Sequence, residues 1–187
     1  KNYYNFGYDY FDNPKLNFGY GGYKYDGRYK NNVNKIIKKF KLNKKYIIAE
    51  FGCAKGYVLT EFKKKGFNVI GFEKSKYAIK NAHQKVLKNI FYIKKINELK
   101  NYNFDFMICK DVLPSLTKKE IDELIKISIL KSKLRPYFVI QTFKKKENQD
   151  KFKFWDKTHK CLFNITEWKL YLKKFDKKII YSFNELF

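Results

Sequence analysis

The chain has 187 residues, and its 42 lysines and arginines against 18 aspartates and glutamates give a formal net charge of +24. Hydrophobic residues make up 44% and aromatic residues 20% of it, which fits one globular domain and excludes a disordered chain. The three widely spaced cysteines offer no disulfide or zinc-ligand pattern and no apolar run is long enough to span a membrane, so we expect a soluble cytoplasmic domain without a metal site.

Residues 1–29 form an aromatic lead that contains eight of the 16 tyrosines and several glycines, a composition that disfavours a regular helix. So aromatic a segment is expected to pack on another part of the chain. We expect it to act as a lid over a ligand pocket, where Tyr20, Tyr23 and Tyr25 would exclude water. The remaining residues, 30–187, are expected to form the main domain.

A helix is predicted first, over residues 28–42, because apolar residues recur there at helical spacing. From residue 46 onward, short apolar runs typical of strands alternate with helical patterns. The predicted strands cover residues 46–51, 67–73, 89–93, 104–109, 137–143 and 178–183. The predicted helices between them cover residues 56–65, 75–88, 117–131 and 165–175. Residues 144–160 interrupt the alternation with a charged stretch, whose lysine run at 144–146 predicts a solvated loop.

Strand–helix alternation of this length predicts an α/β fold, a doubly wound, mostly parallel, Rossmann-like sheet of six to seven strands with helices on both faces. The strand runs are almost continuously apolar, as expected when helices cover both faces of the sheet. Since the chain ends soon after the sixth predicted strand, we expect a seventh strand to be absent or very short.

The first strand–helix junction carries the clearest motif, Glu50-Phe51-Gly52-Cys53-Ala54-Lys55-Gly56. In such sheets ligands bind beyond the carboxyl ends of the strands, and two glycines let the backbone approach a ligand closely. Glu73 follows at the end of the second strand, where a carboxylate can accept both hydroxyls of a ribose. The pair of features predicts an adenosine-type cofactor. NAD is disfavoured because the middle glycine of its G-x-G-x-x-G fingerprint is missing.

The pattern E-x-G-x-x-x-G at residues 50–56 resembles motif I of the class I S-adenosylmethionine-dependent methyltransferases. The similarity continues through residues 47–82 and through FDFMICKDVLPSL at 104–116. The segments FGYGGYKYDGRY (18–29) and FWDKTHKCLFNITEW (154–168) are similar to a small bacterial subgroup with a YGGYxYDGRW-like lead. The resemblance implies S-adenosyl-L-methionine as the cofactor and methyl transfer as the activity.

Carried over to this sequence, the resemblance implies cofactor contacts at the ends of successive strands. The implied cofactor-binding residues are Glu50, Gly52, Cys53, Ala54, Gly56, Glu73, Lys74, Ile96, Cys109 and Lys110. Many relatives have an acidic residue after the third strand that meets the adenine amino group, whereas residues 94–97 here read Lys-Lys-Ile-Asn. Two further contacts are expected from the aromatic lead. Tyr23 would cover the cofactor, and Arg28 would pair with its carboxylate or, alternatively, with Asp26.

Methyl transfer needs alignment of the acceptor with an already activated methyl group, and a hydroxyl or amine acceptor can also need a general base. Asp111, after the fourth strand, and His159 are the candidate bases. The alternative for Asp111 is a structural cap of its loop, and for His159 an ordinary loop histidine. Many relatives have a histidine where Pro114 stands, so a base is missing at that position.

The leading hypothesis is a methyltransferase of a small molecule, such as a sugar or nucleotide-sugar metabolite. An RNA or protein methyltransferase that uses the lysine-rich surface is the alternative, and a degenerate, non-enzymatic cofactor-binding domain is a second one. All but two of the 42 basic residues are lysines, and the chain is rich in residues with A/T-rich codons. Because arginine is preferred for nucleic-acid contact, codon bias explains the charge better than an RNA partner does. The oligomeric state is not predicted.

Overall fold

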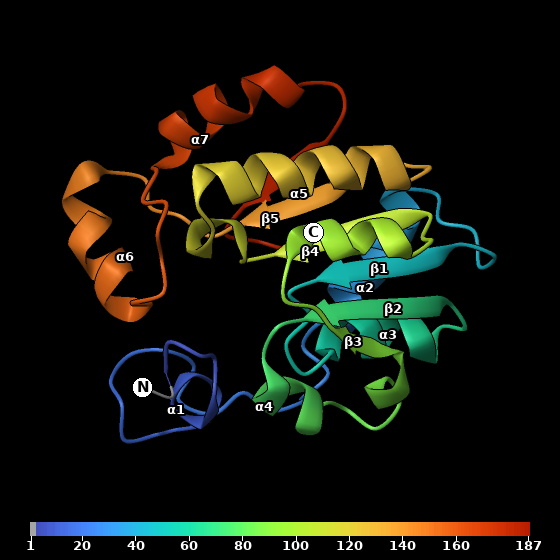
Figure 1. The fold of residues 1–187 in the computed structure, drawn as a ribbon, viewed down its shortest axis with the longest axis horizontal. Coiled ribbons are helices and arrows are strands. Elements are labelled where there is room, and N and C mark those ends of the chain that lie inside the picture. Colours follow the sequence, from blue (N-terminus) through green and yellow to red (C-terminus); the bar gives the residue numbers. More distant parts are fainter. Residues whose placement is uncertain (1–2) are drawn as a thin grey trace.

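A computed structural model describes residues 3–187, in which six strands form one sheet with the order β3-β2-β1-β4-β5-β6 (Figure 1). Every neighbouring pair of strands is parallel. The strands are β1 (Ile47–Phe51), β2 (Asn68–Glu73), β3 (Ile90–Tyr92), β4 (Phe106–Lys110), β5 (Tyr137–Ile140) and β6 (Ile180–Phe183). The predicted doubly wound parallel sheet is therefore confirmed, with six strands among the residues described.

Helices cover both faces of this sheet. The α-helices are α1 (Tyr8–Phe11), α2 (Lys30–Lys39), α3 (Tyr57–Lys64), α4 (Lys76–Lys80), α5 (Lys118–Lys131), α6 (Gln149–Trp155) and α7 (Ile165–Leu172). Short 3₁₀ turns are η1 (Leu87–Asn89), η2 (Ile96–Asn101), η3 (Leu113–Ser115), η4 (Lys146–Asn148) and η5 (Lys173–Phe175). Over residues 3–187, no helix combines the length and the apolar character needed to cross a bilayer.

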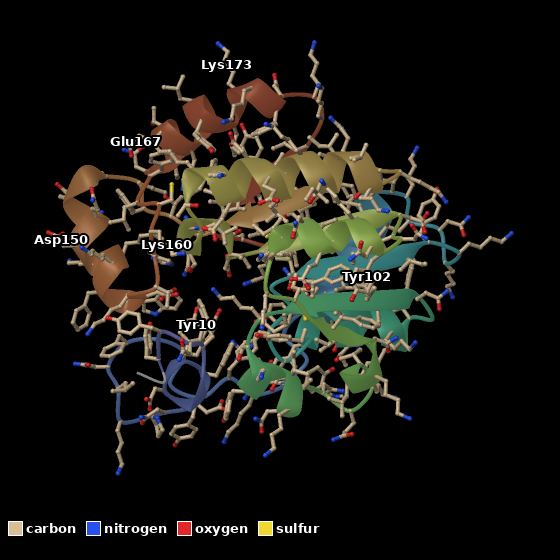
Figure 2. All side chains as sticks on the ribbon, in the orientation of Figure 1. Tyr10, Tyr102, Asp150, Lys160, Glu167 and Lys173 are labelled. Carbon is tan, nitrogen blue, oxygen red and sulfur yellow. The ribbon has the colours of Figure 1, made fainter. Side chains whose placement is uncertain are left out.

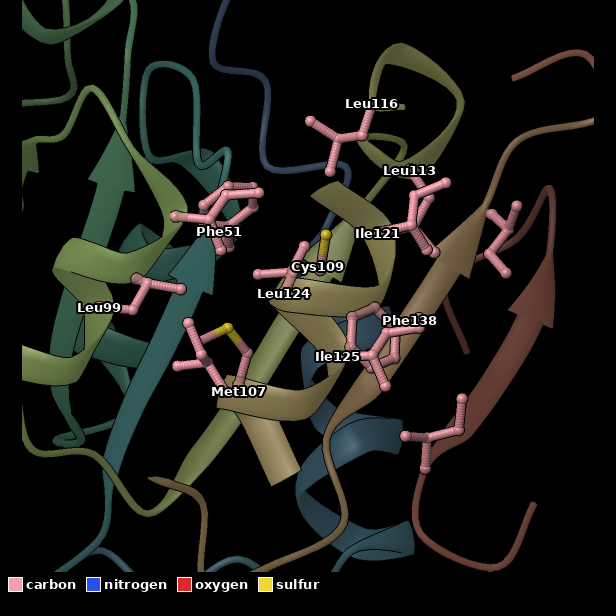
Figure 3. Packing of buried hydrophobic residues seen from close by; sticks show 14 of the residues in the cluster. Phe51, Leu99, Met107, Cys109, Leu113, Leu116, Ile121, Leu124, Ile125 and Phe138 are labelled. Atoms are coloured by element: carbon pink, nitrogen blue, oxygen red, sulfur yellow. The ribbon is translucent and has the colours of Figure 1, made fainter. Parts of the chain in front are cut away.

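Alternate residues of the central strands point to opposite faces of the sheet, and this alternation builds two cores. In β4, Met107 and Cys109 belong to the cluster under α5, α7 and η2, part of which is shown in Figure 3. Phe106 and Ile108 belong to the cluster under α2 and α3. Because both faces are buried, the central strands are apolar at most positions, as the sequence pattern indicated.

Helix α5 follows its sequence prediction closely. The Thr117 hydroxyl accepts a hydrogen bond from the Glu120 backbone N–H, and the Glu120 carboxylate accepts one from the Thr117 backbone N–H at 2.7 Å. This reciprocal capping box satisfies two backbone groups that a helix N-terminus otherwise leaves without partners. The helix therefore begins at a fixed place beside the carboxyl edge of the sheet.

The helix predicted over residues 75–88 is wrong in length, because α4 ends at Lys80. Ser75 caps its start by accepting a hydrogen bond from the Ala78 N–H, as the sequence suggested. The chain then turns, and the His83 N–H donates to the Lys55 carbonyl at 3.0 Å instead of continuing the helix. A hydrogen bond to the glycine-rich loop thus replaces the helical bond that the apolar spacing alone predicted.

Residues 144–160, for which the sequence predicted only a charged stretch with a loop at 144–146, contain α6 at Gln149–Trp155. The lysines of this helix are exposed, while its aromatic residues make the contacts. Phe154 meets Phe18 edge-on with ring centroids 6.3 Å apart, and Trp155 meets Tyr20 at 6.0 Å. These partners of Phe154 and Trp155 lie more than 130 positions earlier in the sequence, where local periodicity carries no information about them.

The aromatic lead is irregular over residues 3–29 except for the four-residue helix α1, as predicted. It packs through a third apolar cluster that includes Tyr3, Tyr10, Phe11 and Ala78. In Figure 1 it lies in blue between α4 and α6. The lead thus touches elements on both sides of the sheet's carboxyl edge.

Candidate functional site

A cavity of about 330 Å³ lies at the carboxyl ends of β1, β2 and β4, under the aromatic lead. The strand order reverses here, since β1 is followed outward by β2 on one side and by β4 on the other. Such a switch point separates two neighbouring strand–helix crossovers and leaves room for a ligand. Figure 2 shows Tyr10 on the side of the lead that faces the rest of the molecule.

The glycine-rich loop after β1 forms one wall of the cavity. Its backbone takes positive φ angles at Gly52 (+70°), Ala54 (+49°) and Gly56 (+73°). A Cβ atom on Gly52 would lie 2.3 Å from the Val112 side chain, so no larger residue fits without a shift. Of the three residues, only Ala54 has a side chain. A positive φ is strained for such a residue, so the contacts around the loop must stabilise this conformation.

Glu73 is fixed by three backbone donors at the end of β2. One carboxylate oxygen accepts the Ala54 N–H at 2.7 Å, and the other accepts the N–H groups of Lys74 at 2.8 Å and Ser75 at 2.7 Å. Burial raises the pKa of Glu73, although these donors oppose the effect. A carboxylate offers about four acceptor positions, so about one is left for a ligand hydroxyl.

Lys110 and Asp111 form an ion pair at the end of β4, on the opposite wall. Burial disfavours the charge on Lys110, but Asp111 and nearby tyrosine hydroxyls outweigh burial and raise the lysine pKa. Asp111 adopts φ +59°, and its second oxygen, Oδ1, is buried without a hydrogen-bond partner among residues 3–187. A buried acceptor without a donor is costly unless a ligand satisfies it.

Beneath this wall lies Glu50, whose side chain is buried in β1. Its Oε2 also has no partner within the described part of the chain. Burial raises the pKa of Glu50 to about 8, with Lys110 opposing the shift and Glu73 adding to it. The two carboxyls, Glu50 and Glu73, therefore place acidic groups below and beside one cavity.

The structure brings half of the predicted site residues together around this cavity. Those that line it are Gly52, Ala54, Glu73, Lys74, Ile96, Lys110 and the candidate base Asp111. Four others are close to the same strand ends but do not line it: Glu50, Cys53, Gly56 and Cys109. Burial raises the pKa of both thiols, which fits packing residues and not nucleophiles.

Three predicted residues lie away from the cavity. Arg28 is exposed and pairs with Asp26 at 2.6 Å, which is the alternative that its sequence context left open. Tyr23 packs on Tyr57, with ring centroids 4.7 Å apart. His159 is buried and stacks on a phenylalanine of α6, and burial lowers its pKa. None of the three is part of the cavity wall.

Other wall residues were not singled out from the sequence. They are Phe6, Tyr10, Phe11, Phe51, Phe72, Ile93, Lys94, Lys95, Asn97, Val112, Ser115, Leu116, Glu120 and Glu123, together with Tyr20 of the expected lid. For the wall residues of α5, the capping box at residues 117–120 is the sequence signal that could have indicated their place. It fixes where that helix begins, and the first turns of a helix that follows a strand end face the carboxyl edge of the sheet.

Two polar anchors hold the aromatic lead over the cavity. Lys55 of the glycine-rich loop is buried and donates to both oxygens of Asp12 at 2.7 Å. Tyr77 also donates to Asp12, and these donors lower the pKa of Asp12 although burial alone would raise it. At the other end, Asp156 accepts hydrogen bonds from the hydroxyls of Tyr3 at 3.1 Å and Tyr10 at 2.8 Å.

Comparison with known proteins agrees with this architecture. Residues 22–182 match a family described as a methyltransferase domain. A SAM-dependent methyltransferase from Archaeoglobus fulgidus is similar in structure, with a TM-score of 0.61 and 22% identity over 79% of this chain and 66% of its own. The YcgJ protein from Bacillus subtilis has a TM-score of 0.61 and 14% identity over 77% and 67%.

A further similar structure is the magnesium protoporphyrin IX methyltransferase of Synechocystis with bound SAH. Its TM-score is 0.56, with 16% identity over 78% of this chain and 71% of that one. This chain thus spans about two thirds of the length of these structures. No curated protein matches the chain by sequence. At these identities, the solved structures establish a shared fold.

Proposed function

The chain belongs to the family of methyltransferase domains, and on that premise we propose that it transfers a methyl group from S-adenosylmethionine to a small-molecule acceptor. The observation that carries this proposal is the cavity at the switch point of the sheet, which is lined by the glycine-rich loop, Glu73 and the Lys110–Asp111 pair. These residues follow three different strands, and the parallel sheet places them side by side.

The polar groups of the cavity fit this cofactor. Glu73 has an acceptor position left for a ribose hydroxyl, and Gly52 and Ala54 bring the backbone of the loop to the cavity wall. When bound, the cofactor supplies an activated methyl group, so the protein's task is to align the acceptor with it.

Asp111 is the residue we assign as proton acceptor for the incoming hydroxyl or amine. Its Oδ2 is held by Lys110, which fixes the carboxylate, while Oδ1 stays free. A base must lie within hydrogen-bond reach of the proton that it removes, and Asp111 lies in the cavity wall whereas His159 does not. His159 therefore contributes to packing of the segment after α6.

The aromatic lead favours a small molecule over a polymer as the methyl acceptor. Phe6, Tyr10, Phe11 and Tyr20 contribute rings to the cavity wall, and rings of this kind pack against flat or sugar-like molecules. We propose that residues 1–29 act as a lid on the domain formed by residues 30–187. A lid that is anchored at both ends encloses a metabolite, such as a sugar or a nucleotide-sugar, more readily than a folded RNA or a protein.

Calorimetric titration with S-adenosylmethionine and S-adenosylhomocysteine tests the proposal. We expect the parent protein to bind both, and Glu73→Ala to bind them about 10- to 100-fold more weakly, because a hydrogen bond to a charged group is lost. Glu147→Ala, on an exposed residue, is the matched control. Thermal unfolding checks that each variant is folded. A parent protein that binds neither compound contradicts the function, and equal binding by Glu73→Ala contradicts only the ribose assignment.

A further inference from the structure

We propose that Glu123, in the second turn of α5, accepts the hydrogen bond of the adenine amino group and so selects an adenosine cofactor. The inference rests on the proposed function, because it concerns the same cavity. It assigns this role to a residue of helix α5 and not to residues 94–97 after β3, which contain no acidic residue.

The cavity has two chemically different ends on either side of Glu73. One end holds the glycine-rich loop and the Lys110–Asp111 pair, and it suits the charged amino-acid part of the cofactor. The other end is formed by residues 93–97 after β3 and by the start of α5, and its apolar members are Ile93, Ile96 and Leu116. Apolar side chains suit the two faces of a purine ring, so the base belongs at this second end.

Helix α5 and η2 lie side by side along this end. The pairing is fixed at their far ends, where the Lys131 ammonium donates to the Lys100 carbonyl at 3.1 Å. It is also fixed by packing, since Leu99 and Leu124 belong to the same buried cluster and both appear in Figure 3. Glu123 therefore lines the cavity next to the turn that begins at Ile96.

An exocyclic amine that enters such a pocket loses its water and needs an acceptor. The sequence Lys94-Lys95 offers only donors in its side chains, and the Asn97 side chain belongs to an exposed residue. Among the residues that line this end, the carboxylates are those of Glu120 and Glu123. These two side chains are therefore the charged acceptors that this end of the cavity offers.

Glu120 is engaged through one of its two oxygens. Its Oε2 accepts the Thr117 N–H at 2.7 Å and the Thr117 hydroxyl at 2.8 Å, and it lies 3.7 Å from the ammonium of Lys160. Glu123 is half-buried, and it has no hydrogen bond or ion pair with any side chain or backbone group that the structure describes. Both oxygens of Glu123 are therefore available for the base, whereas one oxygen of Glu120 is committed to capping the helix.

The test compares S-adenosylhomocysteine with S-inosylhomocysteine, in which an oxygen replaces the adenine amine. We expect the parent protein to prefer the adenine compound by about 10-fold or more, because the hypoxanthine oxygen faces a carboxylate. Glu123→Gln should lose most of this preference, since its amide can donate to that oxygen. Glu120→Gln, one turn earlier on the same helix, should keep the preference even if its altered capping lowers thermal stability.

The outcomes distinguish a failure of the proposed function from a failure of the assignment to Glu123 alone. A parent protein that binds neither compound overturns the proposed function, and the inference falls with it. A parent protein that binds both equally well, or a Glu123→Gln variant that discriminates as the parent does, overturns the inference alone. Loss of the preference in Glu120→Gln but not in Glu123→Gln would transfer the role to Glu120 and equally overturn the assignment to Glu123.

Discussion

Glu50 is a carboxyl group whose surroundings favour its neutral form. It is buried in the central strand, one of its oxygens has no partner among residues 3–187, and burial raises its pKa to about 8. At neutral pH the side chain is therefore mostly protonated. A positively charged ligand above Glu50 would favour the ionised form. The side chain can therefore become negatively charged beneath the cavity when such a ligand binds.

This state predicts a pH dependence of folding. A carboxyl whose pKa is raised from 4.5 in the unfolded chain to about 8 in the fold stabilises fully below pH 4.5, and the contribution is lost as the pH rises to about 8. The free energy of unfolding of the parent protein, relative to Glu50→Gln, should fall by up to ~1.4 kcal/mol per pH unit in this window. Denaturant unfolding at several pH values measures the difference.

The neutral amide of Glu50→Gln keeps the shape of the side chain, so the variant also serves as its own packing control. Parallel stability curves for the two proteins between pH 5 and pH 8 would show that Glu50 ionises normally, and they would contradict the assignment.

At the same scale, the sequence located the site better than it assigned single side chains. Gly52, Ala54, Glu73, Lys110 and Asp111 line the cavity because residues that follow parallel strands converge at one edge. Their hydrogen bonds could not be read from a motif. The three backbone donors that occupy Glu73 come from the folded loop around it, and they limit it to about one further bond where two had been expected.

At the scale of elements, the aromatic lead depends on contacts with segments distant in the chain. Asp156, two residues before Thr158, accepts hydrogen bonds from Tyr3 and Tyr10 and also from the Thr158 backbone and hydroxyl. The Thr158 hydroxyl lies 3.0 Å from that of Ser115, which itself lines the cavity. The lead, the segment after α6 and the cavity wall are therefore one hydrogen-bonded network.

A double variant, Tyr3→Phe with Tyr10→Phe, tests whether this network holds the lid. Both rings remain, but the two hydrogen bonds to Asp156 are lost, so the lid should open more often. We expect about 10-fold weaker binding of S-adenosylhomocysteine and faster proteolysis within the lead. Calorimetry and timed digestion measure the two effects.

Tyr4→Phe, on an exposed ring, is the control for these measurements and should behave as the parent. Unchanged affinity together with unchanged digestion of the double variant would show that the lead does not act as a lid. Faster digestion with unchanged affinity would show that the hydrogen bonds to Asp156 anchor the lead, but that the lead does not contribute to cofactor binding.

The elements themselves were predictable where local sequence determines them. The capping box of α5 and the apolar strand runs are local patterns, and both were confirmed. The helix over residues 75–88 was too long in the prediction because its end depends on a hydrogen bond from His83 to the Lys55 carbonyl. Helix α6 was missed because Phe154 and Trp155 pack on the lead, far away in sequence.

At the scale of the whole molecule, the net charge of +24 raises the question of a nucleic-acid partner. Binding through many lysines releases counterions and weakens steeply with salt, whereas the binding of a small ligand in the cavity should be nearly indifferent to salt. We expect the affinity for S-adenosylhomocysteine to change less than about twofold between 50 and 200 mM KCl. Any binding of a single-stranded RNA should fall by about 10³ over the same range.

Calorimetry and fluorescence anisotropy measure these two affinities on the same protein preparation. An RNA affinity that persists at 200 mM salt and increases when S-adenosylhomocysteine is present would contradict a small-molecule acceptor. It would point instead to an RNA substrate that binds next to the cofactor.

The contacts between Tyr3 or Tyr10 and Asp156 join positions 153 and 146 residues apart. A ribosome makes the aromatic lead before the strands of the sheet, and it reaches Asp156 only after all strands but β6 have been synthesised. Until then Tyr3 and Tyr10 lack the carboxylate that accepts their hydrogen bonds. The contacts that fasten the lead over the cavity can therefore form only late in synthesis, although the tyrosines that make them are synthesised early.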